Sequence, residues 1–246
     1  MPVLILDIRR IGIYKLFTHH PAAKHLVERF VVECSNEYHQ MDDLEKQSVE
    51  QFNTWSKDFD QKRFLPFYFS NKAVLKTLNP QHGSSILDVG CGTGILLQQL
   101  RQLEKGLNLH GMDIAPEMIK VARAKFGKSV ELRQGFANSL PYDDNSFDYV
   151  TCATSFHHYP NPDNSLREMF RVLKLGGKLV LLDPFTNGFL RKAICELLGI
   201  LFNEKGINLF TKGQMYQLFQ KAEFKKIEQK TYLYYKLITV GVKITV

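Results

Sequence analysis

Three glycines alternate with other residues directly after a short apolar run, in the segment Asp88-Val89-Gly90-Cys91-Gly92-Thr93-Gly94. Glycines in a turn between a strand and a helix permit positive φ and let backbone N–H groups approach a ligand at the helix N-terminus. Their GxGxG spacing differs from the GxGxxG spacing of dinucleotide-binding turns, which disfavours NAD. The loop can enclose the amino-acid end of a smaller ligand, with the Asp88 carboxylate suited to an ammonium group. Alternatively, it is a tight structural turn.

A second acid follows the next apolar run, in His110-Gly111-Met112-Asp113, nineteen residues after Gly94. A carboxylate at the end of the second strand is where nucleotide-binding α/β sheets hold the two hydroxyls of a ribose. The alternative is that Asp113 caps the helix that begins near Pro116. Taken with the glycine loop, Asp113 predicts a ribose site.

Two adjacent histidines follow a later apolar run, in Thr154-Ser155-Phe156-His157-His158-Tyr159-Pro160. Adjacent side chains point in different directions in most backbone conformations, and no Cys or acid spacing nearby completes a ligand set, so we predict no metal. A neutral histidine within hydrogen-bond reach of a hydroxyl can act as a general base. His157 is our first catalytic candidate and His158 the second. The alternative is that both cap the turn before Pro160.

The elements that must position these residues change in character near residue 80. Before it, Pro21–Phe30 and Asp43–Phe59 show the three- and four-residue apolar spacing of amphipathic helices. After it, apolar runs alternate with helix-like segments, as in βα units that build a parallel sheet. The expected strands are Ser85–Val89, Leu109–Met112, Val130–Leu132, Tyr149–Ala153, Lys178–Leu182, Lys226–Tyr235 and Leu237–Val246. We predict a Rossmann-like, doubly wound α/β sheet of seven strands, mostly parallel with an antiparallel C-terminal strand, helices on both faces and an N-terminal helical lid.

Composition limits the class of protein. With 246 residues, 44% hydrophobic and 23% charged, the chain has the make-up of one large globular domain or of one domain plus an extension. Four cysteines without a CxxC pair indicate neither a zinc site nor disulfides, and fit a reducing, cytoplasmic location. No stretch has the roughly 20 apolar residues of a membrane span. The net charge is +7, of which residues 185–246 carry +6, from ten basic and four acidic side chains.

From about Ser84 to Pro184 the chain resembles a class I S-adenosylmethionine-dependent methyltransferase, most closely the ubiquinone/menaquinone-biosynthesis-like (methyltransferase type 11) group. Four blocks carry the likeness: Ile86–Gly94 (cofactor loop), Met112–Met118 (ribose block), Gly135–Pro141 (adenine block) and Arg171–Asp183. The resemblance implies methyl transfer to a small, apolar or aromatic acceptor at O, N or C, with S-adenosylhomocysteine as product. It implies a helical extension and lid at 1–80 and a methyltransferase domain at 81–246, with an apolar helical insertion at about 188–205.

The resemblance also implies the cofactor contacts. They are Asp88, Gly90, Cys91, Gly92, Thr93 and Gly94 at the methionine end, Asp113 at the ribose, Ile114 beside the adenine, Met118 in the ribose block, Phe136, Ala137 and Asn138 in the adenine block, Cys152 and Ala153 beside the methionine portion, and Phe59 in the closing segment. Four positions depart from the family pattern. Phe136 replaces an acid that often recognises the adenine amino group, Phe59 replaces a tyrosine, and His157-His158 replaces the Arg-Asn pair usual in quinone-methylating members, which argues against a quinone acceptor.

Two other functions remain open. A binding protein that keeps the fold without catalysis is consistent with Phe136 and Phe59, whereas a nucleic-acid methyltransferase lacks support because no Asn/Asp-Pro-Pro-Tyr/Phe motif follows the fourth strand. We expect no nucleic-acid partner. We expect an acceptor pocket walled by Phe64, Phe67, Tyr68 and the apolar helix Phe189–Phe202. The basic C-terminal region is either a solvated basic face or a contact surface for anionic lipid headgroups or an acidic substrate. Together with that helix it supports the hypothesis of contact with an anionic membrane.

Overall fold

The computed structural model describes residues 45–201 and 207–244, without the side chains of residues 62–67. Glu45–Val246 forms one compact unit. The helix expected at Pro21–Phe30 and the side chains of Phe64 and Phe67 lie outside the described residues.

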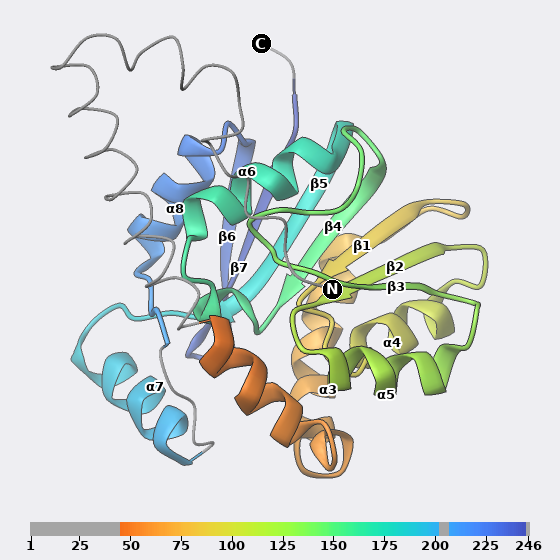
Figure 1. The fold of residues 1–246 in the computed structure, drawn as a ribbon. Helices are drawn as coiled ribbons and strands as arrows, with labels where there is room; N and C mark the ends of the chain where they lie inside the picture. The colour runs from red at the N-terminus through yellow and green to blue at the C-terminus, as the bar shows by residue number, and fades with distance from the viewer. Residues whose placement is uncertain (1–44, 202–206, 245–246) are drawn as a thin grey trace, which may run out of the picture. The chain divides into compact units, whose positions relative to one another are not determined.

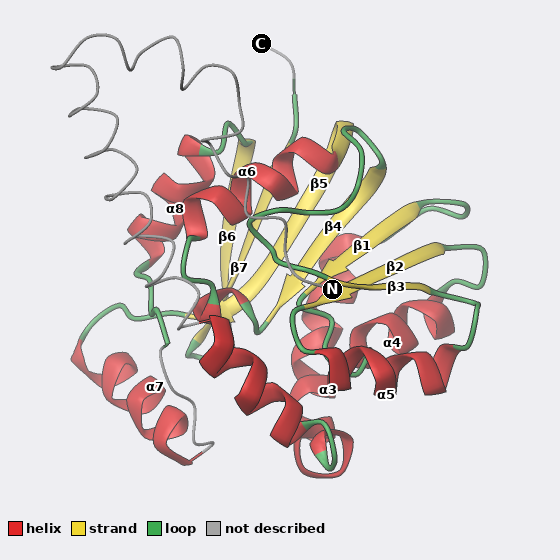
Figure 2. Cartoon of the chain, viewed as in Figure 1, coloured by secondary structure: helices red, strands yellow, loops and turns green. Residues whose placement is uncertain are grey.

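A seven-stranded sheet forms the centre of this unit (Figures 1 and 2). The strands are β1 (Ser85–Val89), β2 (Asn108–Asp113), β3 (Glu131–Gln134), β4 (Phe147–Ala153), β5 (Leu173–Pro184), β6 (Lys225–Tyr232) and β7 (Lys236–Val242). Their order is β3-β2-β1-β4-β5-β7-β6, and neighbours are parallel except that β7 runs antiparallel to both β5 and β6. The predicted strand number, mostly parallel arrangement and antiparallel C-terminal strand are confirmed.

Helices cover both faces of the sheet, also as predicted. They are α3 (Phe59–Leu78), α4 (Ile95–Leu103), α5 (Pro116–Phe126), α6 (Pro162–Val172), α7 (Phe189–Leu201), α8 (Lys212–Lys221) and the short 3-10 helix η2 (Phe156–His158). Because successive strand residues point to opposite faces, Leu179 and Leu181 of β5 pack in the core beneath α6 and α8, whereas Val180 and Leu182 pack in the core beneath α3, α4 and α5.

The chain ahead of the sheet differs from the expected single helix at Asp43–Phe59. Residues 45–55 are helical, residues 56–58 form a turn, and α3 then begins at Phe59. The Ser56 hydroxyl donates to the Asn53 carbonyl at 2.8 Å, which satisfies a carbonyl at the end of the first helix. The segment ahead of the sheet is therefore two helices joined by a turn.

The carboxyl ends of the parallel strands meet at one edge, which we call the carboxyl edge. β1 lies between β2 and β4, so the strand order reverses between β1 and β4. Open α/β sheets bind ligands at the carboxyl ends of the strands beside such a reversal. α3 is fixed to this edge by its first turn, since Asp60 accepts from the Thr93 hydroxyl at 2.5 Å and pairs with Lys125. A second tie is Lys236 of β7, whose Nζ donates to Ser70 Oγ at 2.9 Å and Thr154 Oγ1 at 3.0 Å.

Candidate active site

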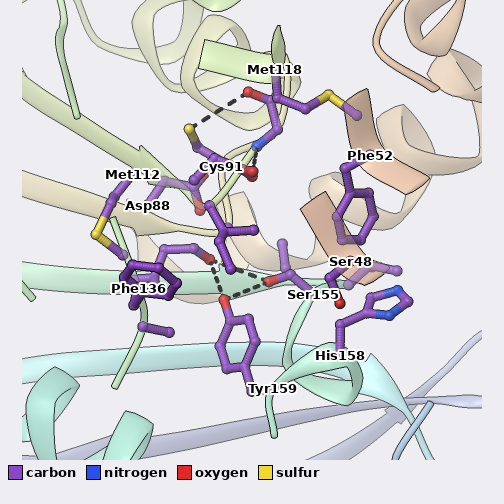
Figure 3. Close-up of a pocket in the computed structure, with 18 of the residues that line it drawn as sticks. Ser48, Phe52, Asp88, Cys91, Met112, Met118, Phe136, Ser155, His158 and Tyr159 are labelled. Atoms are coloured by element: carbon purple, nitrogen blue, oxygen red, sulfur yellow. Dashed lines mark hydrogen bonds between the residues drawn. The ribbon is translucent and has the colours of Figure 1, made fainter. Parts of the chain in front are cut away.

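A cavity of about 1120 Å³, counted with its open mouth, lies at the carboxyl edge (Figure 3). Its walls come from the helix at 45–55, the start and middle of α3, the loop after β1, the end of β2, residues 135–138 and the segment after β4. The cavity therefore lies where the loops of the sheet meet the N-terminal helices, which is where open α/β sheets bind ligands.

The glycine loop adopts the conformation that the sequence predicts. Gly90, Gly92 and Gly94 have φ of 74°, 53° and 83°. A Cβ on Gly90 would lie 2.4 Å from Ser155 Oγ and 2.7 Å from Tyr159 Oη, so only glycine fits there, whereas a Cβ on Gly92 would meet nothing within 4 Å. The loop is thus packed against the segment after β4 at one glycine and open at the next.

Asp113 connects this loop to the start of α5. Its carboxylate accepts the Gly92 N–H at 2.8 Å through Oδ2 and the Ala115 N–H at 2.9 Å through Oδ1. Burial raises the pKa of Asp113 to about 6, against the lowering effect of these backbone hydrogen bonds. The N-cap of α5 is Ala115 rather than Asp113. Asp113 instead lines the cavity.

Asp88 is the second buried acid on the cavity, with 2% of its surface exposed. Thr151 donates its hydroxyl to Asp88 Oδ1 at 2.8 Å. Burial raises the pKa of Asp88 to about 7, the Thr151 hydrogen bond lowers it, and the charge of Asp113 raises it further. Two buried carboxylates that resist ionisation favour a ligand bringing positive charge or hydroxyl donors.

Asn71 of α3 is a third polar group on the cavity, and no sequence motif identifies it. Its side chain is 2% exposed and lines the cavity, and its Oδ1 accepts no hydrogen bond within the described structure. A buried acceptor without a donor costs about 1–3 kcal/mol. Asn71 therefore adds an open acceptor to the cavity that the two carboxylates line, which suits a ligand that brings hydrogen-bond donors.

Most of the predicted site residues line this one cavity. They are Phe59, Asp88, Gly90, Cys91, Gly92, Thr93, Asp113, Ile114, Met118, Phe136, Ala137, Asn138, Ala153 and His158. Gly94 and Cys152 are not among the lining residues. Gly94 is the N-cap of α4, packed so that a Cβ would lie 2.5 Å from the Phe126 ring, and Cys152 is fully buried with its Sγ 3.2 Å from Ser155 Oγ.

The side chains of the two histidines lie in different places, so His158 replaces His157 as the candidate for contact with a ligand. His157 is 2% exposed and lies behind the cavity wall, where its Nδ1 is 2.8 Å from Oδ1 of the equally buried Asp183. His158 lines the cavity, and its ring meets Phe52 edge-on with centroids 5.0 Å apart. The centroids of the two histidine rings are 4.1 Å apart. Only His158 is in a position to touch a ligand.

Phe52 and His158 belong to an aromatic end of the cavity, which we define by Ser48, Phe52, Trp55 and His158. In Figure 3, Ser48, Phe52 and His158 gather on one side, away from Phe136 and Met112. The opposite, acidic end is defined by Asp88, Asp113 and the glycine loop. Lining residues recur along the N-terminal helices at helical spacing, as Glu45, Ser48, Phe52, Trp55 and Phe59. That spacing is the sequence signal by which Glu45 and Ser48 were identifiable.

Ser155 and Tyr159 also line the cavity but were not selected from the sequence. Tyr159 donates its hydroxyl to the Val89 carbonyl at 3.2 Å and lies 3.1 Å from Ser155 Oγ, so the pair joins the segment after β4 to the glycine loop. No sequence signal identifies this link, because it depends on how two loops meet in space.

The departures at Phe59 and Phe136 have different structural settings. Phe59 is 7% exposed and packs with Ile95 and Met118, so it belongs to the core as well as to the cavity wall. Phe136 is 42% exposed on the cavity. Its neighbour Asn138 donates its side-chain amide to Glu45 Oε1 at 3.5 Å, which ties the adenine block to the N-terminal helix.

Three further expectations can be compared with the described residues: they concern a metal site, a membrane-spanning helix and the second wall of the acceptor pocket. Within them, no group of His, Cys, Asp and Glu side chains has the arrangement of a metal site. None of their helices combines the length and the apolar character needed to cross a bilayer. No residue of α7 lines the cavity, so the expected second wall at Phe189–Phe202 is not found there.

Comparison with known proteins agrees with this geometry. A family model described as a methyltransferase domain matches residues 87–181. The demethylmenaquinone methyltransferase of Oceanobacillus iheyensis is 32% identical over 188 residues, which cover 65% of this chain and 78% of that protein. A chain from the complex between the Haloferax volcanii Trm112 methyltransferase activator and its methyltransferase has a TM-score of 0.71 at 22% identity, covering 79% of this chain and 98% of that chain.

A phosphoethanolamine N-methyltransferase of Haemonchus contortus, solved with S-adenosyl-L-methionine, has a TM-score of 0.62 at 21% identity over 72% of this chain and 53% of that chain. At such identities the solved structures establish the fold, and the family follows from the sequence relative and the family model. The chain belongs to the class I S-adenosylmethionine-dependent methyltransferases.

Proposed function

We propose that this methyltransferase acts on a small aromatic or apolar acceptor, at O, N or C. The observation that carries the proposal is a single continuous cavity with an acidic end and an aromatic end. The acidic end suits a polar, cationic methyl donor, whereas the aromatic end offers ring faces and edges together with one imidazole. A donor and a small aromatic acceptor would therefore meet within one cavity.

At the acidic end, Asp88 and Asn71 would bind the ammonium group of the donor and Asp113 would bind its ribose hydroxyls. Phe136, Ala137 and Asn138 would line the adenine. When bound, S-adenosylmethionine supplies an electrophilic methyl group on a sulfonium sulfur. The protein's main contribution to such an in-line displacement is alignment and the exclusion of water. We propose that residues 45–60 act as the lid that provides both.

At the aromatic end, His158 is the candidate general base. If the acceptor is a hydroxyl, His158 would take its proton as the oxygen bonds to the methyl carbon. His157 would act as a positioning residue, because its ring lies against His158 while Asp183 holds its far side. A carboxylate accepts the Nδ1 proton of His157 and fixes the orientation of that ring.

The similarity to demethylmenaquinone methyltransferases supports an aromatic acceptor of quinone type. His157-His158, in place of the usual Arg-Asn pair, favours an aromatic acceptor other than the quinone of those relatives. Phenols and quinols are therefore the first compounds to test as acceptors, followed by aromatic amines.

Isothermal titration with S-adenosylmethionine and S-adenosylhomocysteine, on wild type and Asp113→Ala, tests the donor site. We expect dissociation constants in the micromolar range, roughly −8 kcal/mol, for wild type and loss of binding in the variant. Failure of wild type to bind either compound would overturn the donor site and favour a protein that keeps the fold without the activity.

Transfer of a labelled methyl group to the acceptor panel tests the aromatic end. With an acceptor found, His158→Gln is expected to lower turnover about 100-fold and to leave the affinity for S-adenosylhomocysteine unchanged. Donor binding without transfer to any compound in the panel would favour a non-catalytic binding protein.

A further inference from the structure

Helix α7 directs its apolar side chains away from the protein. The exposed fractions are 88% for Phe189, 60% for Leu190, 56% for Leu197, 76% for Ile200 and 68% for Leu201. At 3.6 residues per turn these five positions fall within an arc of roughly 120°. The buried residues of the helix, Cys195 and Gly199, lie on the opposite side. A surface helix ordinarily turns its apolar stripe to the core, so this orientation calls for a partner.

The apolar surface continues onto neighbouring elements. The Arg191 guanidinium of α7 lies 4.6 Å from the centroid of the Tyr234 ring, and its Nε donates to the Tyr234 carbonyl at 2.9 Å. Leu233 and Tyr234, in the turn between β6 and β7, are each 49% exposed. Tyr232 donates its hydroxyl to the carbonyl of Phe69, which is 50% exposed on α3. We call the arc of α7 together with Phe69, Leu233 and Tyr234 the outer face.

Cations border the outer face. Lys72 Nζ lies 5.2 Å from the centroid of the Phe69 ring, Arg191 lies against Tyr234, and the side chain of Lys192 is 65% exposed. Glu196, which is 3.8 Å from Lys192, is the one acid of α7. Apolar side chains bordered by Lys, Arg and Tyr match the boundary between acyl chains and anionic headgroups of a bilayer.

The basic excess of residues 185–246 is not concentrated on one face. Lys236 is buried, Lys221 is 3.7 Å from Asp163, and Lys243 donates to Asn145 Oδ1 and the Arg171 carbonyl. The net charge of residues 185–246 therefore does not by itself define a membrane-binding surface. The apolar arc of α7 defines the surface, and a few cations at its border give it a preference for anionic partners.

The outer face shares the carboxyl edge with the cavity. Pro184, at the end of β5, pairs with Lys236 at the start of β7, so α7 and the turn at 233–235 both lie at this end of the sheet. Figure 1 shows α7 beyond the arrow tips of the parallel strands. A membrane that contacts the outer face would therefore adjoin the end of the sheet where the cavity lies.

We propose that the outer face is a membrane-docking surface, with α7 lying in the headgroup region of an anionic bilayer. A second copy of the chain is a poorer partner, because both copies would bring the same cationic border to the interface, with Glu196 as the one acid of α7 to pair with it. The proposal does not depend on the identity of the methyl acceptor.

Vesicle co-sedimentation tests the proposal, using phosphatidylcholine vesicles and equimolar phosphatidylcholine–phosphatidylglycerol vesicles. The full chain is expected to partition onto the anionic vesicles more strongly than onto the neutral ones. The double variant Phe189→Gln/Ile200→Gln should lower that partition about tenfold or more, and both residues are too exposed for the change to remove core packing. Leu175→Gln is the matched control, because Leu175 is 61% exposed near the amino end of β5 and should leave partition unchanged.

Equal partition of the double variant and wild type would overturn the proposal, as would wild type remaining in the supernatant with both kinds of vesicle. A wild-type dimer in sedimentation velocity that the double variant abolishes, without vesicle binding, would assign the face to a second copy instead. Titration with S-adenosylhomocysteine shows whether the double variant is folded and keeps the donor site, so that failure of docking and failure of the proposed function are distinguished.

Discussion

The acidic end of the cavity is bounded by main chain and two buried carboxylates, whereas the aromatic end is bounded by side chains that come from distant parts of the sequence. Gly90 and Gly92 approach the cavity through their backbone, and Asp113 is held by two backbone N–H groups. Phe52 and His158, by contrast, are 106 residues apart and meet only through their rings.

This difference predicts different consequences of mutation. The acidic end tolerates little change, because no neighbouring group can move to accommodate an added Cβ or replace a lost carboxylate. Ring contacts at a lid can be exchanged for others of similar volume with smaller losses. The acidic end should therefore determine whether the donor binds, and the aromatic end should determine which acceptor reacts.

The largest effect is expected from Gly90→Ala. The new Cβ would overlap Ser155 and Tyr159, and alanine disfavours the φ of 74°, so we expect the free energy of unfolding to fall by about 3 kcal/mol. Gly92→Ala is the matched control, because its Cβ meets nothing and only the φ of 53° costs about 1 kcal/mol. Urea denaturation measures both values. Equal stability of the two variants would contradict the tight packing of the loop.

The second largest effect is expected from Asp88→Asn, which should make the protein more stable and weaken its binding of the donor. Between pH 4 and about 7 the folded protein keeps a proton on Asp88 that the unfolded chain has lost, so this group lowers the free energy of unfolding as the pH rises. Asp88→Asn keeps an acceptor for Thr151 and removes the buried charge. We expect it to raise stability at pH 8 by about 2 kcal/mol and to weaken donor binding.

Thermal denaturation of wild type and Asp88→Asn at pH 5 and pH 8, without ligand, measures this change. The two proteins should differ more at pH 8 than at pH 5. A variant that is less stable than wild type at pH 8 would show that the carboxylate is stabilised by its surroundings, and the acidic end would lose its proposed electrostatic character.

Asn71→Ala is expected to have a moderate effect that is confined to the donor. Its Oδ1 accepts no hydrogen bond within the described structure, so its removal should cost the free protein little. The affinity for S-adenosylmethionine should fall about tenfold, since a hydrogen bond to a charged group contributes roughly 1.5 kcal/mol or more. Calorimetric titration supplies the affinity. Unchanged affinity would remove Asn71 from the donor site.

The smallest effect is expected from Phe52→Ala at the aromatic end. Losing the ring contacts with Trp55 and His158 should raise KM for the acceptor about fivefold, close to 1 kcal/mol. The affinity for S-adenosylhomocysteine should stay within about twofold of wild type. Steady-state kinetics with an acceptor found in the panel of phenols, quinols and aromatic amines would provide the measurement. A larger loss of donor affinity than of acceptor KM would break the division between the two ends.

The acidic end was the more predictable from sequence, because its parts are contiguous. β1 spans the predicted Ser85–Val89, and all three glycines have the positive φ that their spacing indicated. Strand β5 was predicted too short, as Lys178–Leu182, because Gly176 and Gly177 indicated a break. The strand instead passes through them, and the Gly176 N–H donates to the Lys243 carbonyl of a segment far away in sequence.

The aromatic end was less predictable because it depends on contacts between separate segments. Sequence alone does not distinguish His157 from His158. The distinction arises from Asp183 at the end of β5, which holds His157 behind the wall. The turn at residues 56–58 likewise interrupts a pattern that is helical on both sides, so that the lid consists of two helices instead of one.

The position of β7 between β5 and β6 has a consequence for the order of synthesis. β6 leaves the ribosome before β7, but among the described strands it pairs with β7 alone. Until β7 arrives, the apolar strand β5 has one unpaired edge within that sheet. Val180 and Leu182, fully buried in the finished sheet, belong to that edge. Unpaired apolar edges are sites of intermolecular association. A nascent chain of this protein is therefore most exposed to aggregation in the interval between the synthesis of β5 and that of β7.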